Sequence, residues 1–139
     1  MANDLLLPVR DLKTYFFLDE GTVKAVDGVS FDIRRGETVC VVGESGCGKT
    51  VLGRSILQIV DPPGRIVEGT ITYYRTSAQG NGSNRTEEIA LTSLNPKGRE
   101  MRLIRGSEIS MIFQEPLAAL SPVHTIGSQM IEDIQLHTL

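Results

Sequence analysis

The sequence predicts an α/β fold in which a glycine-rich loop joins a buried strand to an amphipathic helix, with an antiparallel β region ahead of them. Three observations predict this fold. A β-branched run at residues 38–42 is followed at once by a glycine-rich loop, Gly43–Thr50. Apolar positions recur at helical spacing directly after the loop. Short apolar segments separated by turn residues occupy residues 5–33.

The region before the loop contains short apolar and aromatic segments that are interrupted at Asp19–Gly21 and at Asp27–Gly28. This pattern is typical of short antiparallel strands connected by turns. Residues 38–42, by contrast, are a continuous β-branched and apolar run. Such a run predicts a strand that is buried on both faces of a parallel sheet.

After the loop, Leu52, Ile56 and Ile59 recur at helical spacing, which predicts a helix that begins near Lys49. The aspartate, prolines and glycine of Asp61–Gly64 predict the end of that helix.

Residues 67–88 divide into a segment of alternating side chains and a polar segment. Residues 67–74 alternate apolar and polar side chains, which predicts a half-exposed strand. The polar stretch Arg75–Glu88 then predicts a surface loop or an insertion.

A short basic helix is expected over residues 97–105, with Asn95–Pro96 as its cap and first residue and Gly106 as its stop. Its basic side chains predict a solvated face, and Met101 and Ile104 predict the face that packs.

Residues 108–113 predict another strand, which delivers Gln114 at its carboxyl end. In parallel α/β sheets that edge is where ligands bind. The final segment, residues 125–139, places apolar side chains four residues apart and predicts a helix.

Composition limits the function classes. The 139 residues, 40% of them apolar and 22% charged, suit one soluble globular domain. A net charge of −3 provides no basic footprint for nucleic acid, so nucleic acid is not expected as a partner. Cys40 and Cys47 have neither metal-ligand nor redox spacing, and nothing marks secretion, so a reduced cytoplasmic protein is expected.

The loop carries the chemistry. Gly43, Gly48, Lys49 and Thr50 satisfy the G-x-x-x-x-G-K-[ST] pattern between a predicted strand and a predicted helix. Glycines, including Gly46, allow successive N–H groups to point at phosphate oxygens, beside the positive end of the helix dipole. Lys49 would reach the β- and γ-phosphates, and the Thr50 hydroxyl would ligate Mg²⁺. The alternative is an accidental glycine turn. The expected ligand is ATP with Mg²⁺, held by Gly43, Glu44, Ser45, Gly46, Cys47, Gly48, Lys49 and Thr50.

A phosphate loop alone does not identify a reaction, because GTPases, small-molecule kinases, motors and transporter ATPases share it. Three further features narrow the choice. About forty residues precede the loop, Tyr15 and Phe16 lie within them, and Gln114 follows a predicted strand. A GTPase or kinase would need an Asn-Lys-x-Asp motif or a lid, and neither is seen in the sequence.

At these residues the sequence resembles the nucleotide-binding domain of ATP-binding cassette (ABC) transporters, and more narrowly the oligopeptide, dipeptide and nickel importer ATPases. The likeness spans nearly the whole chain apart from residues 75–88. The matching segments are residues 9–12, 23–33, 42–49, 109–116 and 120–127, with Gln129.

The resemblance implies roles for residues outside the loop. Phe16 takes the position whose ring stacks on adenine, and Tyr15 is the less favoured choice by register. The alternative for Phe16 is a core aromatic residue of a strand. Gln114 matches the glutamine loop, which ligates Mg²⁺, senses the γ-phosphate and leads into residues that contact the permease. An exposed amide at a strand end is the alternative for Gln114.

The resemblance also implies partners and a location. It implies transmembrane permease subunits and a second ATP-binding subunit, identical or merely similar. It places the protein in the cytoplasm, peripheral on the membrane through the permease. It implies uptake of peptides or a similar small solute such as nickel, driven by ATP hydrolysis.

The sequence departs from the family in lacking the signature loop, the apolar Walker B run ending in Asp-Glu, and the switch histidine. Residues 1–139 are therefore expected to be the N-terminal portion of one ATP-binding domain, ending before its helical subdomain is complete. Because several charge-stabilising groups are missing together, residues 1–139 alone are expected to hydrolyse little or no ATP, whereas the full-length protein is expected to be an ATPase. The alternative is a non-catalytic module that binds nucleotide or permease.

Overall fold

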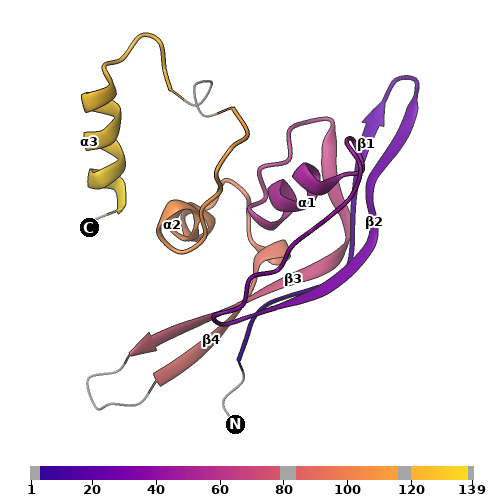
Figure 1. Cartoon of the computed structure of the whole chain (residues 1–139), viewed down its shortest axis with the longest axis horizontal. Helices are drawn as coiled ribbons and strands as arrows, with labels where there is room; N and C mark the ends of the chain where they lie inside the picture. Colours follow the sequence, from indigo (N-terminus) through magenta and orange to yellow (C-terminus); the bar gives the residue numbers. More distant parts are fainter. Residues whose placement is uncertain (1–3, 79–83, 116–119, 138–139) are drawn as a thin grey trace. The chain divides into compact units, whose positions relative to one another are not determined.

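The computed structural model describes residues 4–78, 84–115 and 120–137 (Figure 1). Contacts divide the chain into two compact units, Met1–Pro96 and Lys97–Leu139.

The first unit is built on a long antiparallel hairpin of β1 (Leu5–Leu18) and β2 (Gly21–Arg34), as Figure 1 shows. The expectation of antiparallel strands here is confirmed, with the turn between Leu18 and Gly21. The turn expected at Asp27–Gly28 was wrong, because both residues lie inside β2. Gly28, at φ +80°, is the extra residue of a bulge between the pairs Leu12–Val29 and Lys13–Asp27.

Two further strands complete a four-stranded sheet in the order β2-β1-β3-β4. β3 (Gly64–Ala78) pairs antiparallel with β1 through its first half and with β4 (Asn84–Ala90) through its second half. The half-exposed strand expected at residues 67–74 is therefore confirmed and is longer than expected.

The loop or insertion expected at Arg75–Glu88 was wrong for residues 75–78 and 84–88, which pair as strands; residues 79–83 lie outside the described residues. Arg75 faces Glu87 across the two strands in a 3.2 Å ion pair. The pattern concealed these strands because their exposed side chains are polar on both faces, so no apolar alternation marks them.

The strand expected at residues 38–42 does not form within the part of the chain that the structure describes. Val42 is 91% exposed, and the segment pairs with no described strand. The strand expected at residues 108–113 is likewise missing apart from one bridge between Arg105 and Ile109, and Ile112 is 95% exposed. An extended segment becomes a strand only by hydrogen bonding to a neighbouring strand. The composition of the segment does not reveal whether such a partner strand is present.

Helix α1 (Lys49–Ile56) begins at the expected residue and packs through Leu52 and Ser55, both buried. It ends before the expected stop at Asp61–Gly64, because Gln58 adopts a left-handed backbone at φ +52°. The turn η1 (Leu91–Ser93) follows β4. The buried apolar core of this unit is Leu7, Val9, Leu12, Val26, Leu52, Leu57, Ile71, Ile89 and Leu91.

The second unit contains α2 (Arg99–Ser107) and α3 (Ile126–His137), both of which were expected. Met101 and Ile104 are fully buried, as predicted. The expected cap at Asn95 was wrong, because the helix is capped by Gly98. Asparagine and proline are equally suited to a turn, and a turn is what Pro96 forms here.

None of the helices in the described ranges is long and apolar enough to cross a membrane.

Candidate nucleotide-binding site

The loop at residues 43–48 is shaped by left-handed glycines. Gly46 has φ +80° and Gly48, which caps α1, has φ +94°. The Cys47 N–H donates to the Glu44 carbonyl at 3.3 Å and closes the turn. Left-handed residues within such a turn bring successive N–H groups to one concave side, which suits an anion.

Gly48 and Gly43 also lie close to neighbouring atoms. A Cβ added to Gly48 would lie 2.1 Å from the carbonyl oxygen of Ala25 on β2. A Cβ added to Gly43 would lie 2.5 Å from the Cys47 sulfur. The loop therefore approaches the backbone of β2 at a distance that only glycine permits, and Gly43 leaves room for the Cys47 side chain, whereas Gly46 has open space around it and needs glycine for φ alone.

Lys49 folds back over the loop. Its ammonium donates to the carbonyls of Gly43 at 2.7 Å and Glu44 at 2.6 Å, and lies 3.5 Å from the Cys47 sulfur. The positive charge is thus held inside the curve of the loop. Thr50, in the first turn of α1, is exposed. The loop supplies a cation, a hydroxyl and a helix N-terminus at one place, which together suit a phosphate chain with its metal.

A hollow of about 250 Å³ adjoins the loop. The loop contributes Cys47–Lys49 to its lining, the preceding segment contributes Val41 and Val42, and β2 contributes Ala25–Asp27. The hairpin, the approach to the loop and the helix start therefore share one cavity wall.

Phe16, the expected adenine-stacking residue, lies in β1 opposite Val23 and Gly64 and is half-buried. Its ring packs against Gly64, where an added Cβ would lie 2.5 Å from the ring. This contact supports the alternative that Phe16 is a core aromatic residue of the strand. Stacking of its ring on adenine stays a prediction.

Tyr15 makes a different set of contacts. Its hydroxyl donates to Asp27 at 2.5 Å, and the Lys24 ammonium lies 5.3 Å from its ring centroid. The hydrogen bond to Asp27, followed by burial, raises the pKa of Tyr15 above 10.0. Sequence reasoning missed Asp27 as a residue of the cavity wall, because the Asp-Gly pair resembled a turn and carried no other signal.

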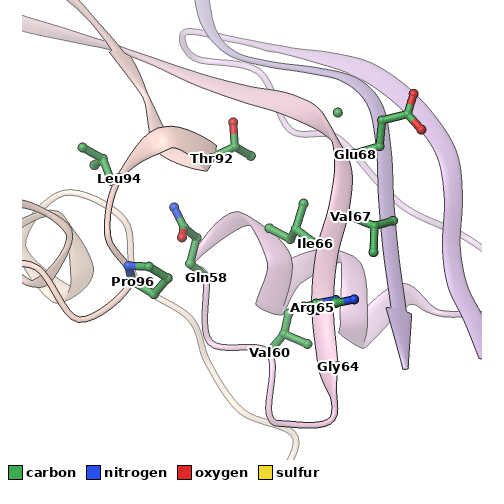
Figure 2. Close-up of a pocket in the computed structure, with 11 residues that line it drawn as sticks. Gln58, Val60, Gly64, Arg65, Ile66, Val67, Glu68, Thr92, Leu94 and Pro96 are labelled. Carbon is green, nitrogen blue, oxygen red and sulfur yellow. The ribbon is translucent and has the colours of Figure 1, made fainter. Parts of the chain in front are cut away.

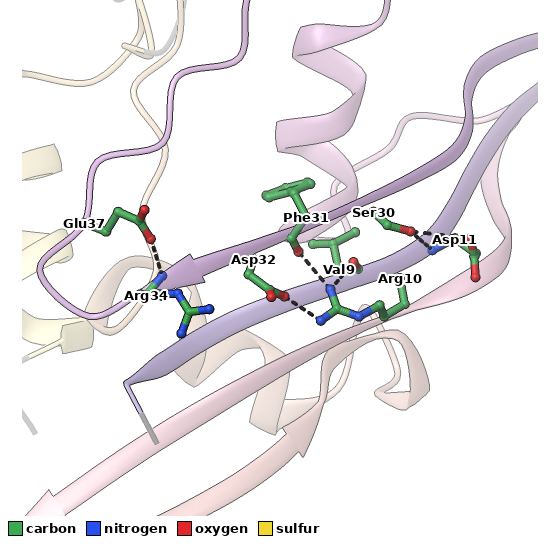
Figure 3. A network of polar contacts seen from close by, with 8 residues as sticks. All are labelled: Val9, Arg10, Asp11, Ser30, Phe31, Asp32, Arg34 and Glu37. Carbon is green, nitrogen blue, oxygen red and sulfur yellow. Dashed lines mark hydrogen bonds and ion pairs between the residues drawn. The ribbon is translucent and has the colours of Figure 1, made fainter. Parts of the chain in front are cut away.

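The strand ends that lead to the loop are fixed by polar contacts (Figure 3). The Arg10 guanidinium pairs with Asp32 at 2.6 Å and donates to the carbonyl of Phe31 at 3.2 Å. At the end of β2 the Arg34 N–H donates to the Glu37 carboxylate at 3.1 Å. These contacts hold the point at which the chain leaves the sheet for the loop.

A second hollow, of about 440 Å³, lies beside β3 and η1 (Figure 2). Figure 2 shows Ile66 on the side of β3 that faces Gln58, whose amide donates to the Leu91 carbonyl. Two charged residues of its lining are engaged elsewhere: the Arg65 guanidinium lies 4.5 Å from the Phe17 ring centroid, and Glu68 pairs with Lys13. This hollow has none of the loop's phosphate-binding features.

Gln114 is an exposed residue of the second unit. Its expected contact with Mg²⁺ stays a prediction, as do the roles of Glu44 and Ser45, which are exposed in the loop.

A left-handed glycine loop with a lysine folded over it and a helix beginning at that lysine is the arrangement of a phosphate-loop nucleotide-binding protein. The family model described as ABC transporter matches residues 26–138, which include this loop. The chain belongs to the ABC transporter family.

Relatives of the chain are ATP-binding proteins of transport systems. It is 42% identical over 135 residues, 96% of its length, to a probable peptide ABC transporter ATP-binding protein of Sinorhizobium fredii. It is 44% identical over 133 residues, 95% of its length, to an oligopeptide transport ATP-binding protein of Bacillus subtilis. It is 36% identical over 132 residues, again 95% of its length, to a glutathione import ATP-binding protein of Escherichia coli. The chain spans 36% of the first two relatives and 20% of the third.

Proposed function

We propose that the chain binds ATP with Mg²⁺ through Gly43–Thr50. The observation that carries this proposal is the geometry of the loop. Gly46 and Gly48 are left-handed, and the Lys49 ammonium lies within hydrogen-bonding distance of the loop's own carbonyls. A cation beside left-handed glycines at the start of a helix is arranged to meet a phosphate chain.

Binding requires Lys49 to exchange partners. Its hydrogen bonds to the carbonyls of Gly43 and Glu44 are replaced by charge-assisted bonds to phosphate oxygens, which are the stronger kind. The Thr50 hydroxyl and the Gln114 amide are the groups proposed to hold Mg²⁺. Mg²⁺ held there would offset the negative charge of the phosphates. Phe16, or Tyr15 on the same strand, is proposed to stack on the base.

For the whole protein, we propose an ATP-binding subunit of an ABC importer that couples ATP hydrolysis to uptake of peptides or similar small solutes. This substrate class is supported by the similarity to the probable peptide ABC transporter ATP-binding protein of Sinorhizobium fredii and the oligopeptide transport ATP-binding protein of Bacillus subtilis. Permease subunits and a second ATP-binding subunit are its proposed partners. Its proposed place is the cytoplasmic face of the membrane, reached through the permease.

The nucleotide proposal is tested by isothermal titration calorimetry with MgATP. The wild-type protein binds, and Lys49→Ala abolishes binding while the far-ultraviolet circular dichroism spectrum stays the same. The control, Lys97→Ala, removes a lysine of the second unit and leaves the affinity unchanged. Unaltered affinity in Lys49→Ala would count against the assignment of the loop.

The transport proposal is tested by uptake of a labelled oligopeptide in cells whose copy of the gene is disrupted. Uptake falls on disruption, returns with a wild-type copy, and does not return with the Lys49→Ala copy. Uptake of a single labelled amino acid serves as the control and stays constant. Normal peptide uptake after disruption of the gene would refute the proposed substrate class and would leave the nucleotide proposal unaffected.

A further inference from the structure

A buried pair of hydroxyl groups connects β1 to α1. The oxygens of Thr14 and Ser55 lie 2.8 Å apart, and both residues are completely buried. The Ser55 hydroxyl also donates to the carbonyl of Val51 at 2.7 Å. Because a serine hydroxyl carries one hydrogen, Thr14 is the donor in the pair. The chain of bonds therefore runs from β1, through two hydroxyls, to the first turn of α1.

We propose that this hydroxyl pair sets the spacing between the base-binding strand and the phosphate loop, and so makes Thr14 a positioning residue for ATP. The inference rests on the proposed nucleotide site. Thr14 lies two residues before Phe16, so their side chains leave β1 on the same face. Val51, at the other end of the bonds, follows Lys49 and Thr50 directly.

The position of α1 depends on noncovalent contacts of this kind, because the segment that leads into the helix is not held in a sheet. Residues 38–44 join no strand within the described part of the chain, and Val42 is almost fully exposed. Leu52 is the buried apolar residue of α1 that borders the cavity with β2, and Gly48 at the helix start lies against the Ala25 carbonyl. Apolar packing stabilises without direction, whereas a buried hydrogen bond fixes one register.

That register matters for a ligand that contacts both β1 and the loop. The cavity beside the loop is walled by β2, which is paired with β1, and by Leu52 and Lys49 of α1. A shift of α1 along β1 would change the distance from the base-binding ring to Lys49. It would leave the loop's own geometry, fixed by Gly46 and Gly48, intact. Loss of the Thr14–Ser55 hydrogen bond should therefore weaken the binding of ligands that contact both β1 and the loop. It should not weaken the binding of ligands that occupy only the loop.

The experiment compares ATP with inorganic tripolyphosphate, each with Mg²⁺, by calorimetry on the intact chain. Tripolyphosphate has the phosphate chain but no base. Wild type is expected to bind ATP more tightly than tripolyphosphate. In Thr14→Val, which keeps the shape of the side chain, the Kd for ATP is expected to rise about three- to tenfold, while the Kd for tripolyphosphate changes less than about twofold. Thr14→Ser, which keeps the hydroxyl, restores the wild-type ratio.

Ser55→Ala provides a second variant, should Thr14→Val fail to fold, and is expected to show the same selective loss. Equal loss for both ligands, or no loss for either, would overturn the inference and assign the pair to stability alone. Equal affinity of wild type for both ligands would overturn it too, while the phosphate site stands. Absence of binding by wild type to either ligand would refute the proposed nucleotide function itself.

Discussion

Gly48 lies so close to Ala25 that a Cβ on the glycine would fall 2.1 Å from the alanine carbonyl oxygen. This approach seats the phosphate loop on β2, and Gly48 is also the cap of α1 at φ +94°. Gly48 thus belongs to both the loop and the helix start, and it lies against the hairpin.

Gly48→Ala is therefore expected to destabilise the protein and to weaken MgATP binding. The left-handed backbone alone costs an alanine on the order of 1–2 kcal/mol, and the collision with the Ala25 carbonyl adds to it. Gly46→Ala is the matched control, because Gly46 is also left-handed but has no neighbour within 4 Å. Urea unfolding should show a clearly larger loss for Gly48→Ala, and equal losses would contradict the packing argument.

The thiol of Cys47 is expected to be protected by MgATP. Its sulfur lies 3.5 Å from the Lys49 ammonium and against Gly43, inside the proposed site. Cys40 is also exposed but precedes the loop, so it serves as the reference within the same molecule. Mass spectrometry after brief alkylation should show slower modification of Cys47 with MgATP and an unchanged rate at Cys40. Equal slowing at both cysteines would indicate a general change and not occupation of the loop.

Tyr15 is expected to titrate above the ordinary tyrosine pKa of 10.0, because its neutral hydroxyl donates to Asp27. A pKa raised in the folded state means that this bond contributes fully below pH 10 and is lost as pH rises through the folded pKa. Tyrosinate absorbance, compared with Tyr15→Phe to isolate this residue, should show the raised pKa. Asp27→Ala should return it toward 10.0, and an unshifted titration in that variant would disprove the attribution.

Leu52→Ala is expected to cost about 2–5 kcal/mol of unfolding free energy, because Leu52 is buried between α1 and the hairpin. Val42→Ala, at a side chain 91% exposed, should change the unfolding free energy by less than about 0.5 kcal/mol. Chemical denaturation of both variants gives the comparison. Similar effects would mean that residues 38–42 are packed, as the sequence pattern alone had predicted.

The features that the sequence predicted correctly are those with a local cause. The loop and the start of α1 follow from glycine and lysine at fixed spacing, and the first hairpin follows from apolar segments and a turn at Asp19–Glu20. The burial of Met101 and Ile104 follows from their spacing on one helical face.

Errors arose where a property depends on a distant partner. Residues 38–42 have the composition of a buried strand, yet no described strand hydrogen bonds to them. The converse error occurred at Arg75–Glu88, where polar side chains concealed two strands that find partners in each other. Strand pairing is decided by which backbones meet, and the alternation of side chains reports only which face is buried.

By itself, then, the sequence determined the phosphate loop, the helix that follows it and the resemblance to ABC transporters, because these reside in short runs of residues. Only the tertiary structure decided which side chains from elsewhere border that loop. Asp27 and Ala25 reach it from β2, and Thr14 reaches Ser55 across 41 positions of sequence. Such neighbours are set by the register of the hairpin and by the packing of α1 on it, and no local pattern encodes either of them.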